Sequence, residues 1–227
     1  MHFGTSVKRC RRSSKLTTVA SIQARMGASR LPNKMMLHLH GYPVCEWVFR
    51  RVQQAEKIDQ VVFVLPNTEK DDVLARYLES IGASLFRGSE TNLVERHYLA
   101  AKEVGADQIV RVCADNPLIC ASEIDRVIDF FEQEHCDYAY NHIPRENHYP
   151  DGLGAEICSM QLLEKIHQNA VTSEQREHLF NTIWDNQTDY IIKTFDPADE
   201  IAHPELKLDL DTMDDYQSLL EKPYRID

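Results

Sequence analysis

Short apolar runs alternate along the chain with longer segments in which apolar and polar positions are mixed. The runs at residues 18–24, 60–65 and 108–113 have the length and composition of strands buried on both faces of a sheet. Shorter strands are expected at residues 84–86, 137–140, 155–159 and 190–195. Helices are expected at residues 43–56, 68–80, 91–104, 122–134, 160–169, 173–186 and 213–221. This alternation predicts an α/β fold with a mostly parallel sheet and helices on both faces.

Signals between these elements indicate where they begin and end. Pro43 suits the first turn of a helix, and Thr68 and Ser122 suit helix N-caps. Residues 207–211 are expected to be extended and to lead into the last helix. Residues 141–154 are polar and rich in His, Pro and Gly, which is typical of a surface loop or a small lobe.

The first sixteen residues differ in composition from the rest of the chain. They include five basic residues and no acidic residue, whereas the whole chain has 25 Lys and Arg against 36 Asp and Glu. The remainder therefore has a net charge of about −16. We expect residues 1–16 to form a disordered basic tail and residues 17–227 to form one domain. Because so acidic a domain repels polyphosphate chains, no nucleic-acid partner is expected.

Cysteine usage and hydropathy bear on the compartment. None of the six cysteines belongs to a C-x-x-C pair, and most lie within apolar stretches. This pattern favours reduced thiols over a disulfide framework or a zinc site. No apolar run approaches the roughly 20 residues needed to cross a bilayer. We therefore expect a cytoplasmic protein without a membrane span.

The loop after the first predicted strand is cationic. Residues 22–34 read I-Q-A-R-M-G-A-S-R-L-P-N-K and place Arg25, Arg30 and Lys34 around Gly27, which permits close approach of the backbone to a ligand. Guanidinium and ammonium groups in this arrangement suit a triphosphate and a leaving pyrophosphate. The loop matches neither a Walker motif nor a dinucleotide-binding motif. Its composition alone also fits a solvated basic loop.

Two further segments place carboxylates at the ends of extended segments. Asp115 follows the strand at residues 108–113, and a carboxylate held there suits Mg²⁺, which prefers oxygen ligands. Asp209 and Asp211 alternate along an extended segment, so both are expected on one face. A turn or helix-cap role for Asp115 and Asp211 stays open. Because open α/β sheets bind ligands at the carboxyl ends of their strands, we expect the three motifs to meet in one cleft.

Together these motifs resemble the spore coat polysaccharide biosynthesis protein F family. That family belongs to the cytidylyltransferases, which include the CMP-Kdo and acylneuraminate synthetases. Residues 22–34 match its opening pattern I-Q-A-R-M-G-S-S-R-L-P-x-K at nearly every position. Matching blocks follow in the family's order at residues 87–90, 115–119, 149–153, 176–178 and 210–215. The resemblance covers the chain from about residue 17 to its end.

The resemblance implies a fold and an assembly. The fold is a Rossmann-like, glycosyltransferase-A-type three-layer sandwich with a mixed, mostly parallel sheet, as in nucleotide-diphospho-sugar transferases. A small acceptor and dimerisation lobe is implied around residues 141–186, and members are commonly homodimers.

The resemblance also implies an activity and its residues. CMP moves from CTP to a sugar or sugar-acid acceptor with release of pyrophosphate, in the biosynthesis of surface polysaccharides or glycan precursors. Asp115 and Asp211 would hold Mg²⁺ and, with Arg25 and Lys34, form the catalytic set. Arg96 is a further candidate near the nucleotide. The implied nucleotide-binding residues are Ala24, Arg25, Gly27, Ser29, Arg30, Lys34, Arg87, Gly88, Ser89 and Arg111.

The acceptor side is implied by the same resemblance. His178 suits a general base, although a helix-surface or core histidine fits the sequence as well. Gly154 stands where the family often has Asp, which removes a carboxylate from the implied acceptor pocket, and Asn33 stands where glycine is usual. The implied acceptor-binding residues are Asp151, Glu156, Arg176 and His178.

Three other functions compete with this interpretation. The donor could be a different nucleoside triphosphate, or the acceptor a phosphorylated metabolite that is not a sugar. A metal-dependent glycosyltransferase also uses strand-end aspartates, although the cations of residues 25–34 favour a free triphosphate over a nucleotide-sugar diphosphate. A non-catalytic nucleotide-sensing module would bind nucleotide without turning it over.

Overall fold

The computed structural model describes residues 16–226, and the predicted basic tail lies outside these residues except for Leu16. Within them, a seven-stranded sheet has the order β5-β4-β1-β6-β8-β7-β9. In that order the strands comprise Ser84–Gly88, Gln60–Pro66, Thr18–Gln23, Gln108–Cys113, Glu156–Ser159, Tyr138–Tyr140 and Ile192–Lys193. Only β8 is antiparallel to its neighbours in this sheet, which confirms the predicted mixed, mostly parallel arrangement.

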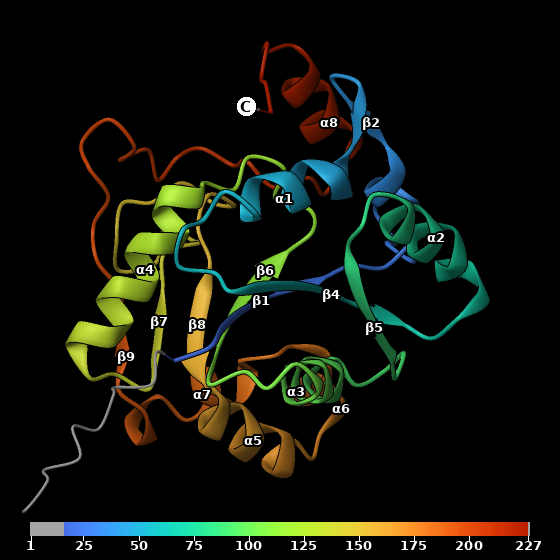
Figure 1. Ribbon diagram of the computed structural model, residues 1–227. Helices are drawn as coiled ribbons and strands as arrows, with labels where there is room; N and C mark the ends of the chain where they lie inside the picture. The colour runs from blue at the N-terminus through green and yellow to red at the C-terminus, as the bar shows by residue number, and fades with distance from the viewer. Residues whose placement is uncertain (1–15, 227) are drawn as a thin grey trace, which may run out of the picture.

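Helices cover both faces of the sheet and give three layers (Figure 1). The helices on one face are α1 (Val44–Val52), α2 (Asp72–Ser80) and α4 (Ala121–Glu134). The helices on the other face are α3 (Leu93–Glu103), α5 (Met160–Asn169), α6 (Ser173–Glu177) and α7 (Asn181–Asp185). Short 3₁₀ helices lie at Lys34–Met36 (η1), Glu69–Asp71 (η2) and Gln187–Asp189 (η3).

Side chains of the central strand β1 alternate between two separate cores. Ala20 and Ile22 pack in the core under α1, α2 and α4, whereas Val19 packs in the core under α3 and α5. Ser21 lies on the same face as Val19, and its Oγ is hydrogen-bonded to Nδ1 of the fully buried His97 at 2.7 Å. Because both faces are covered, this strand is an almost continuous apolar run in the sequence.

A third apolar cluster packs residues from the N-terminal part of the domain against its last helix. It includes Leu39 of β2 (His38–Leu39) and Leu219 of α8 (Met213–Leu220), which pack with Trp47 of α1. β2 pairs with β3 (Tyr42–Pro43) in a hairpin that the sequence analysis did not predict, since each strand has only two residues. Leu31 and Leu210 belong to the same cluster. The loop after β1 and the segment before α8 are therefore held close together.

The predicted helix over residues 173–186 is wrong, because the structure has two short helices there. The backbone is extended at His178, with φ −124° and ψ 116°, and this separates α6 from α7. Residues 173–186 therefore do not form one continuous helix, and α6 ends before His178.

Two predicted N-caps are also wrong. Thr68 caps no helix with its side chain, and its hydroxyl donates to the carboxylate of Asp71 instead. α4 begins one residue before Ser122, after Cys120. Residues 207–211 are not a strand of the sheet, and they pair only through an isolated bridge between Asp151 and Lys207.

No helix in the described part of the chain is long and apolar enough to span a membrane. The cysteines at residues 45, 113, 120, 136 and 158 are free thiols.

Candidate active site

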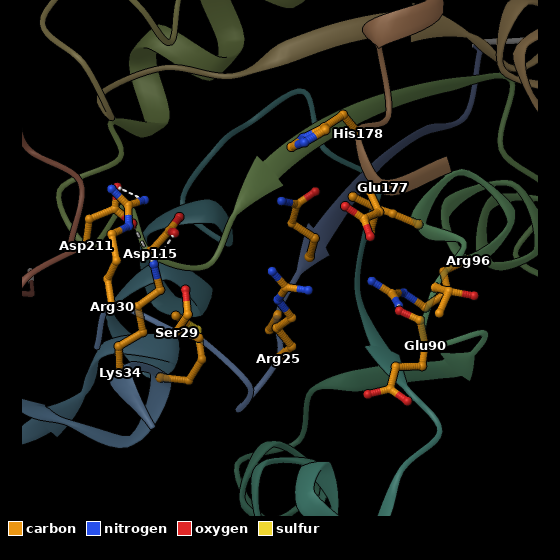
Figure 2. A pocket seen from close by; sticks show the side chains of 16 residues that line it. Arg25, Ser29, Arg30, Lys34, Glu90, Arg96, Asp115, Glu177, His178 and Asp211 are labelled. Atoms are coloured by element: carbon orange, nitrogen blue, oxygen red, sulfur yellow. Dashed lines mark hydrogen bonds and ion pairs between the residues drawn. The ribbon is translucent and has the colours of Figure 1, made fainter. Parts of the chain in front are cut away.

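A pocket of about 460 Å³ opens where β1 and β6 end, at their carboxyl ends (Figure 2). Eight of the residues that the sequence analysis assigned to the site line it, namely Ala24, Arg25, Ser29, Arg30, Lys34, Asp115, His178 and Asp211. Arg96, the further candidate near the nucleotide, also lines it. The predicted meeting of the cationic loop, Asp115 and Asp211 in one cleft is therefore observed.

A buried carboxylate anchors the cationic loop through its backbone. Oδ1 of Asp71, a fully buried residue, accepts a hydrogen bond of 2.8 Å from the backbone N–H of Met26. At the other end of the loop, Asn33 has a left-handed backbone with φ 61°. Asn tolerates this conformation better than most residues, which explains how it stands where glycine is usual.

The ammonium group of Lys34 joins the loop to both predicted metal ligands. Its Nζ donates to Oδ2 of Asp115 at 2.6 Å and to Oδ1 of Asp211 at 3.0 Å. The main-chain oxygen of Leu210 accepts a third hydrogen bond of 2.8 Å from the same nitrogen. On its far side, Oδ2 of Asp211 accepts from Nη2 of Arg30 at 2.7 Å. Three segments that are distant in sequence thus converge on one nitrogen atom.

Charge and burial shift the pKa values of Lys34 and Asp211 in opposite directions. Burial by itself lowers the pKa of Lys34, but the charges and hydrogen bonds of Asp115 and Asp211 outweigh it and raise the pKa above its usual range. Burial likewise raises the pKa of Asp211, but Lys34 and Arg30 outweigh it and lower this pKa. Lys34 and Asp211 are therefore both charged near neutral pH.

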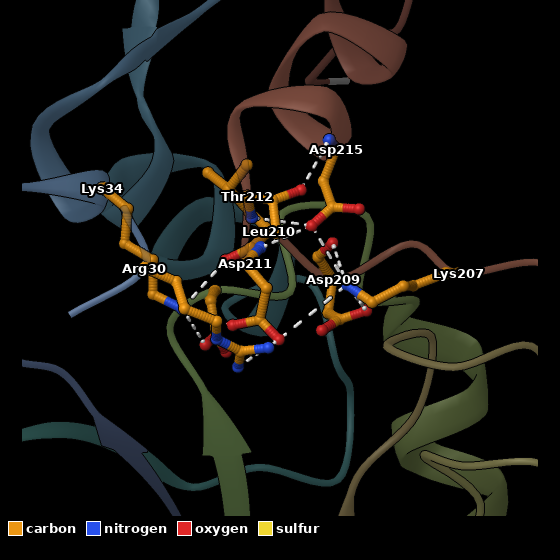
Figure 3. Close-up of polar contacts among 9 residues, drawn as sticks. Arg30, Lys34, Lys207, Asp209, Leu210, Asp211, Thr212 and Asp215 are labelled. Atoms are coloured by element: carbon orange, nitrogen blue, oxygen red, sulfur yellow. Dashed lines mark hydrogen bonds and ion pairs between the residues drawn. The ribbon is translucent and has the colours of Figure 1, made fainter. Parts of the chain in front are cut away.

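The start of α8 determines where Asp211 points (Figure 3). Thr212 is the N-cap of this helix and forms a capping box with Asp215, whose carboxylate also accepts from the backbone N–H of Asp211. The backbone N–H of Leu210 donates to the main-chain oxygen of Asp115 at 2.7 Å. Asp211 is thus not the helix cap, an alternative that the sequence left open, and its carboxylate is available to the pocket.

The two aspartates fit a magnesium ion by their chemistry. Within residues 16–226 no group of three or more His, Cys, Asp and Glu side chains is arranged to hold a metal ion. Asp115 and Asp211 nevertheless each place an oxygen within 3.0 Å of the same ammonium nitrogen, so together they are able to hold one cation. Mg²⁺ commonly takes one or two carboxylates and completes its shell with water and phosphate oxygens.

The opposite wall of the pocket has a buried cation (Figure 2). Arg96 is 4% exposed, and its Nη1 donates to the main-chain oxygens of Ser89 and Glu90. Its Nε is buried and has no hydrogen-bond partner. Burial, and then the nearby charge of Arg25, lower the pKa of Arg96 to about 10. This wall is therefore suited to an anionic ligand or to the oxygen atoms of a base.

Several residues assigned from the sequence do not line the pocket. Arg87 forms an ion pair with Asp72 at 2.7 Å, and Nε of Arg176 donates to the main-chain oxygen of Ala170 at 3.1 Å. Asp151 is half-buried; burial and then the charge of Asp209 raise its pKa to about 6. The other assigned residues outside the lining are Gly27, Gly88, Ser89, Arg111 and Glu156.

Arg111 and Glu156 pair with each other beneath the pocket. Nη1 of Arg111 donates to Oε2 of Glu156, whose other oxygen accepts from the hydroxyl of Tyr138. Burial opposes ionisation of Glu156, but Arg111, His142 and these hydrogen bonds outweigh it and lower its pKa. Nε of Arg111 donates to Oε1 of Gln23 at 3.1 Å, and Gln23 lines the pocket. The pair is thus linked to the pocket lining through Gln23.

The glycine at position 154 has a packing reason. A Cβ atom there would lie 2.2 Å from Oδ1 of Asn141 and 2.3 Å from its main-chain oxygen. Asn141 is fully buried and accepts a hydrogen bond of 2.8 Å from the backbone N–H of Ala155. The departure from the family pattern is therefore accommodated by Asn141, which occupies the space of the missing side chain.

The sequence analysis missed some of the lining residues. Glu177 and His178 lie together at the end of α6, but only His178 was assigned, since the break between α6 and α7 was not foreseen. Glu177 belongs to the matched block at residues 176–178, so the block itself was the available signal. Other unassigned lining residues are Gln23, Ala28, Met35, Glu90, Thr91 and Leu93.

A sheet of this topology, with a cationic loop and two aspartates in one pocket at the carboxyl ends of its strands, has the architecture of a nucleotidyltransferase. Comparison with known proteins narrows this class. The chain belongs to the cytidylyltransferase family, whose sequence profile matches residues 19–221. Membership of this family identifies the protein as a nucleotidyltransferase that uses CTP.

Individual relatives agree with the family. The spore coat polysaccharide biosynthesis protein SpsF of Bacillus subtilis is 28% identical over 203 residues, which cover 87% of this chain and 82% of SpsF. A solved cytidylyltransferase from Leptospira borgpetersenii serovar Hardjo-bovis is 29% identical with a TM-score of 0.81, covering 90% of this chain and 85% of that one. CMP:2-keto-3-deoxy-manno-octonic acid synthetase, solved in complex with CTP, shares the fold with a TM-score of 0.68 at 17% identity over 90% of this chain and 97% of its own.

Proposed function

We propose that the pocket binds CTP together with Mg²⁺ and transfers CMP to a sugar or sugar-acid acceptor, with release of pyrophosphate. The observation that carries this proposal is the convergence of Lys34, Asp115 and Asp211 beside Arg25 in one pocket. The relationship to SpsF favours a role in the biosynthesis of surface polysaccharides or glycan precursors.

The triphosphate binds among the cations of the loop. Arg25, Arg30 and Lys34 offer guanidinium and ammonium donors, and Ser29 adds a hydroxyl on the same side of the pocket (Figure 2). The base lies toward residues 88–91, where Arg96 holds the main-chain oxygens of the loop. These groups position the nucleotide and stabilise charge that moves onto the leaving pyrophosphate.

Asp115 and Asp211 would hold Mg²⁺, which would supply positive charge to stabilise the reacting phosphates. Arg30, which donates to the second oxygen of Asp211, orients that carboxylate. Asp115 is oriented through its main chain, which accepts from the backbone N–H of Leu210.

The acceptor approaches from the wall formed by Glu177 and His178 (Figure 2). A hydroxyl oxygen of the acceptor attacks the α-phosphorus of CTP and gives up its proton to the imidazole of His178 or to water, while the bond to the pyrophosphate oxygen breaks in line with it and pyrophosphate leaves with the electron pair. The carboxylate of Glu177 is able to accept hydrogen bonds from the hydroxyl groups of a sugar, and the imidazole of His178 faces the same groups. Acceptor roles for Asp151, Glu156 and Arg176 stay predictions, since none of these residues lines the pocket.

Pyrophosphate release tests the proposal. Purified protein with Mg²⁺ should release pyrophosphate from CTP in the presence of sugar acids or sugars, and much less from UTP, ATP or GTP. Preference for another triphosphate would identify the donor as a different nucleotide. Sugar transfer from a nucleotide sugar would identify a glycosyltransferase, and nucleotide binding without release would identify a sensing module.

We also propose a homodimer in the cytoplasm. The reduced thiols and the CTP requirement support the compartment, and resemblance to the family supports the dimer. Sedimentation equilibrium of the full chain measures the assembly directly, and a monomer at micromolar concentration would contradict it.

A further inference from the structure

The ammonium nitrogen of Lys34 has all three of its hydrogen-bond donors used by oxygen atoms of the pocket wall. Oδ2 of Asp115, Oδ1 of Asp211 and the main-chain oxygen of Leu210 lie at 2.6, 3.0 and 2.8 Å from it. The Lys34 side chain is 11% exposed, so little water competes for these contacts. The oxygens form a small cage around one positive charge.

We infer that the metal ion and the ammonium group of Lys34 use the same three oxygens, so that one must leave when the other binds. The inference rests on the proposed function, because Asp115 and Asp211 are its metal ligands. It adds the main-chain oxygen of Leu210 as a third ligand and makes the ammonium group of Lys34 and the ion alternative occupants of one position.

The chemistry of the cage supports a shared position. Carboxylate and carbonyl oxygens are the ligands that hard divalent cations prefer. An ion held by Asp115 and Asp211 would need metal–oxygen distances of about 2.0–2.1 Å, and Nζ of Lys34 lies within 3.0 Å of an oxygen atom of each carboxylate. Two cations at one position would repel strongly and overlap. Lys34 and the ion therefore exclude each other.

A bound nucleotide would offer Lys34 another partner in the pocket. Lys34 lines the pocket together with Arg25 and Ser29, where the triphosphate is proposed to bind. Phosphate oxygens compensate the ammonium charge that Asp115 and Asp211 lose to the ion. Nucleotide and metal consequently increase each other's affinity, since coupling between two ligands is reciprocal. Lys34 is then a positioning residue in the free protein and a phosphate ligand in the complex.

Metal binding to the nucleotide-free protein tests this inference. Mn²⁺, followed by electron paramagnetic resonance and calorimetry, should bind Lys34→Met about tenfold or more tightly than the unaltered protein, since the competing ammonium is gone. Adding a non-hydrolysable CTP analogue should tighten Mn²⁺ binding in the unaltered protein and change it little in Lys34→Met.

Arg30→Met is the matched control. It removes a positive charge from the same carboxylate, but Arg30 donates to the other oxygen and does not occupy the cage. We expect its Mn²⁺ affinity to change about threefold at most. Equal effects of Lys34→Met and Arg30→Met, or no tightening in Lys34→Met, would overturn the inference. Lys34→Gln, which keeps an N–H donor, replaces Lys34→Met if that variant unfolds.

Failure of the proposed function gives a different result. If the chain is not a CTP-dependent transferase, the unaltered protein releases no pyrophosphate from CTP whatever the Mn²⁺ affinities are. If only the inference fails, pyrophosphate is released, but Lys34→Met binds Mn²⁺ no better than the unaltered protein.

Discussion

Nζ of Lys34 lies 2.6 Å from Oδ2 of Asp115, although 81 positions separate the two residues in the sequence. The contact joins the loop after β1 to the end of β6, and both strands are central and parallel. Their carboxyl ends therefore meet at one edge of the sheet, which is where the pocket lies.

Removing the carboxylate of Asp115 should stop turnover without unfolding the protein. Asp115→Ala is expected to lower the rate of pyrophosphate release from CTP by about 10²–10³, because one of the two carboxylates proposed to hold Mg²⁺ beside the reacting phosphates is lost. The thermal midpoint should change little, since the side chain is partly exposed. Asp214→Ala, at an exposed position in the same acidic part of the chain, serves as the control and should keep full activity.

Arg96 should affect nucleotide binding more than the chemical step. Arg96→Lys removes Nη1, the atom that donates to the main-chain oxygens of both Ser89 and Glu90, so the loop at residues 88–91 loses its support. We expect KM for CTP to rise about tenfold or more while kcat falls less. A fall in kcat with an unchanged KM for CTP would contradict this role. Arg76→Lys, on the exposed side of α2, should change neither constant.

Glu156 should prove to be a structural residue. Glu156→Gln leaves Arg111 buried without its charge partner and should lower the free energy of unfolding by about 3–5 kcal/mol. If Glu156→Gln loses stability but keeps its KM for the acceptor, then Glu156 does not bind the acceptor. A large rise in that KM with normal stability would restore the acceptor role implied by the family.

The acid sensitivity of the fold should depend on the same residue. The pKa of Glu156 is lower in the folded protein than its usual 4.5. Its ionised form therefore stabilises the fold above that pH, and the stabilisation is lost as the pH falls through the lowered pKa. Urea unfolding at a series of pH values below 5 should show a steeper loss of stability in the unaltered protein than in Glu156→Gln.

Gly154→Asp should destabilise the protein even though it restores the residue common in the family. The new Cβ would lie 2.2 Å from Oδ1 of the buried Asn141, and overpacking of this kind costs about 1–3 kcal/mol or more. Gly27→Ala is the control, because its Cβ would lie 3.5 Å from the side chain of Lys70, an ordinary contact. Urea unfolding of both variants measures the difference, and equal stability of the two would contradict the packing argument.

The sequence by itself determined the sheet and its chemistry. Long apolar runs predicted β1, β4 and β6 nearly to the residue, because strands covered on both faces leave no polar alternation. Parallel strands place their carboxyl ends at one edge, so the meeting of Arg25 and Asp115 followed from topology, whereas Asp211 reaches the pocket from the segment before α8, outside the sheet.

Only the tertiary structure decided what each charged residue does. A sequence does not distinguish a carboxylate that points into a pocket, such as Asp211, from one that is paired in the core, such as Glu156. The hydrogen bonds of Lys34 join it to partners up to 177 positions away. Local propensity fixes elements, whereas side-chain direction and charge pairing are fixed by which distant segments the fold brings into contact.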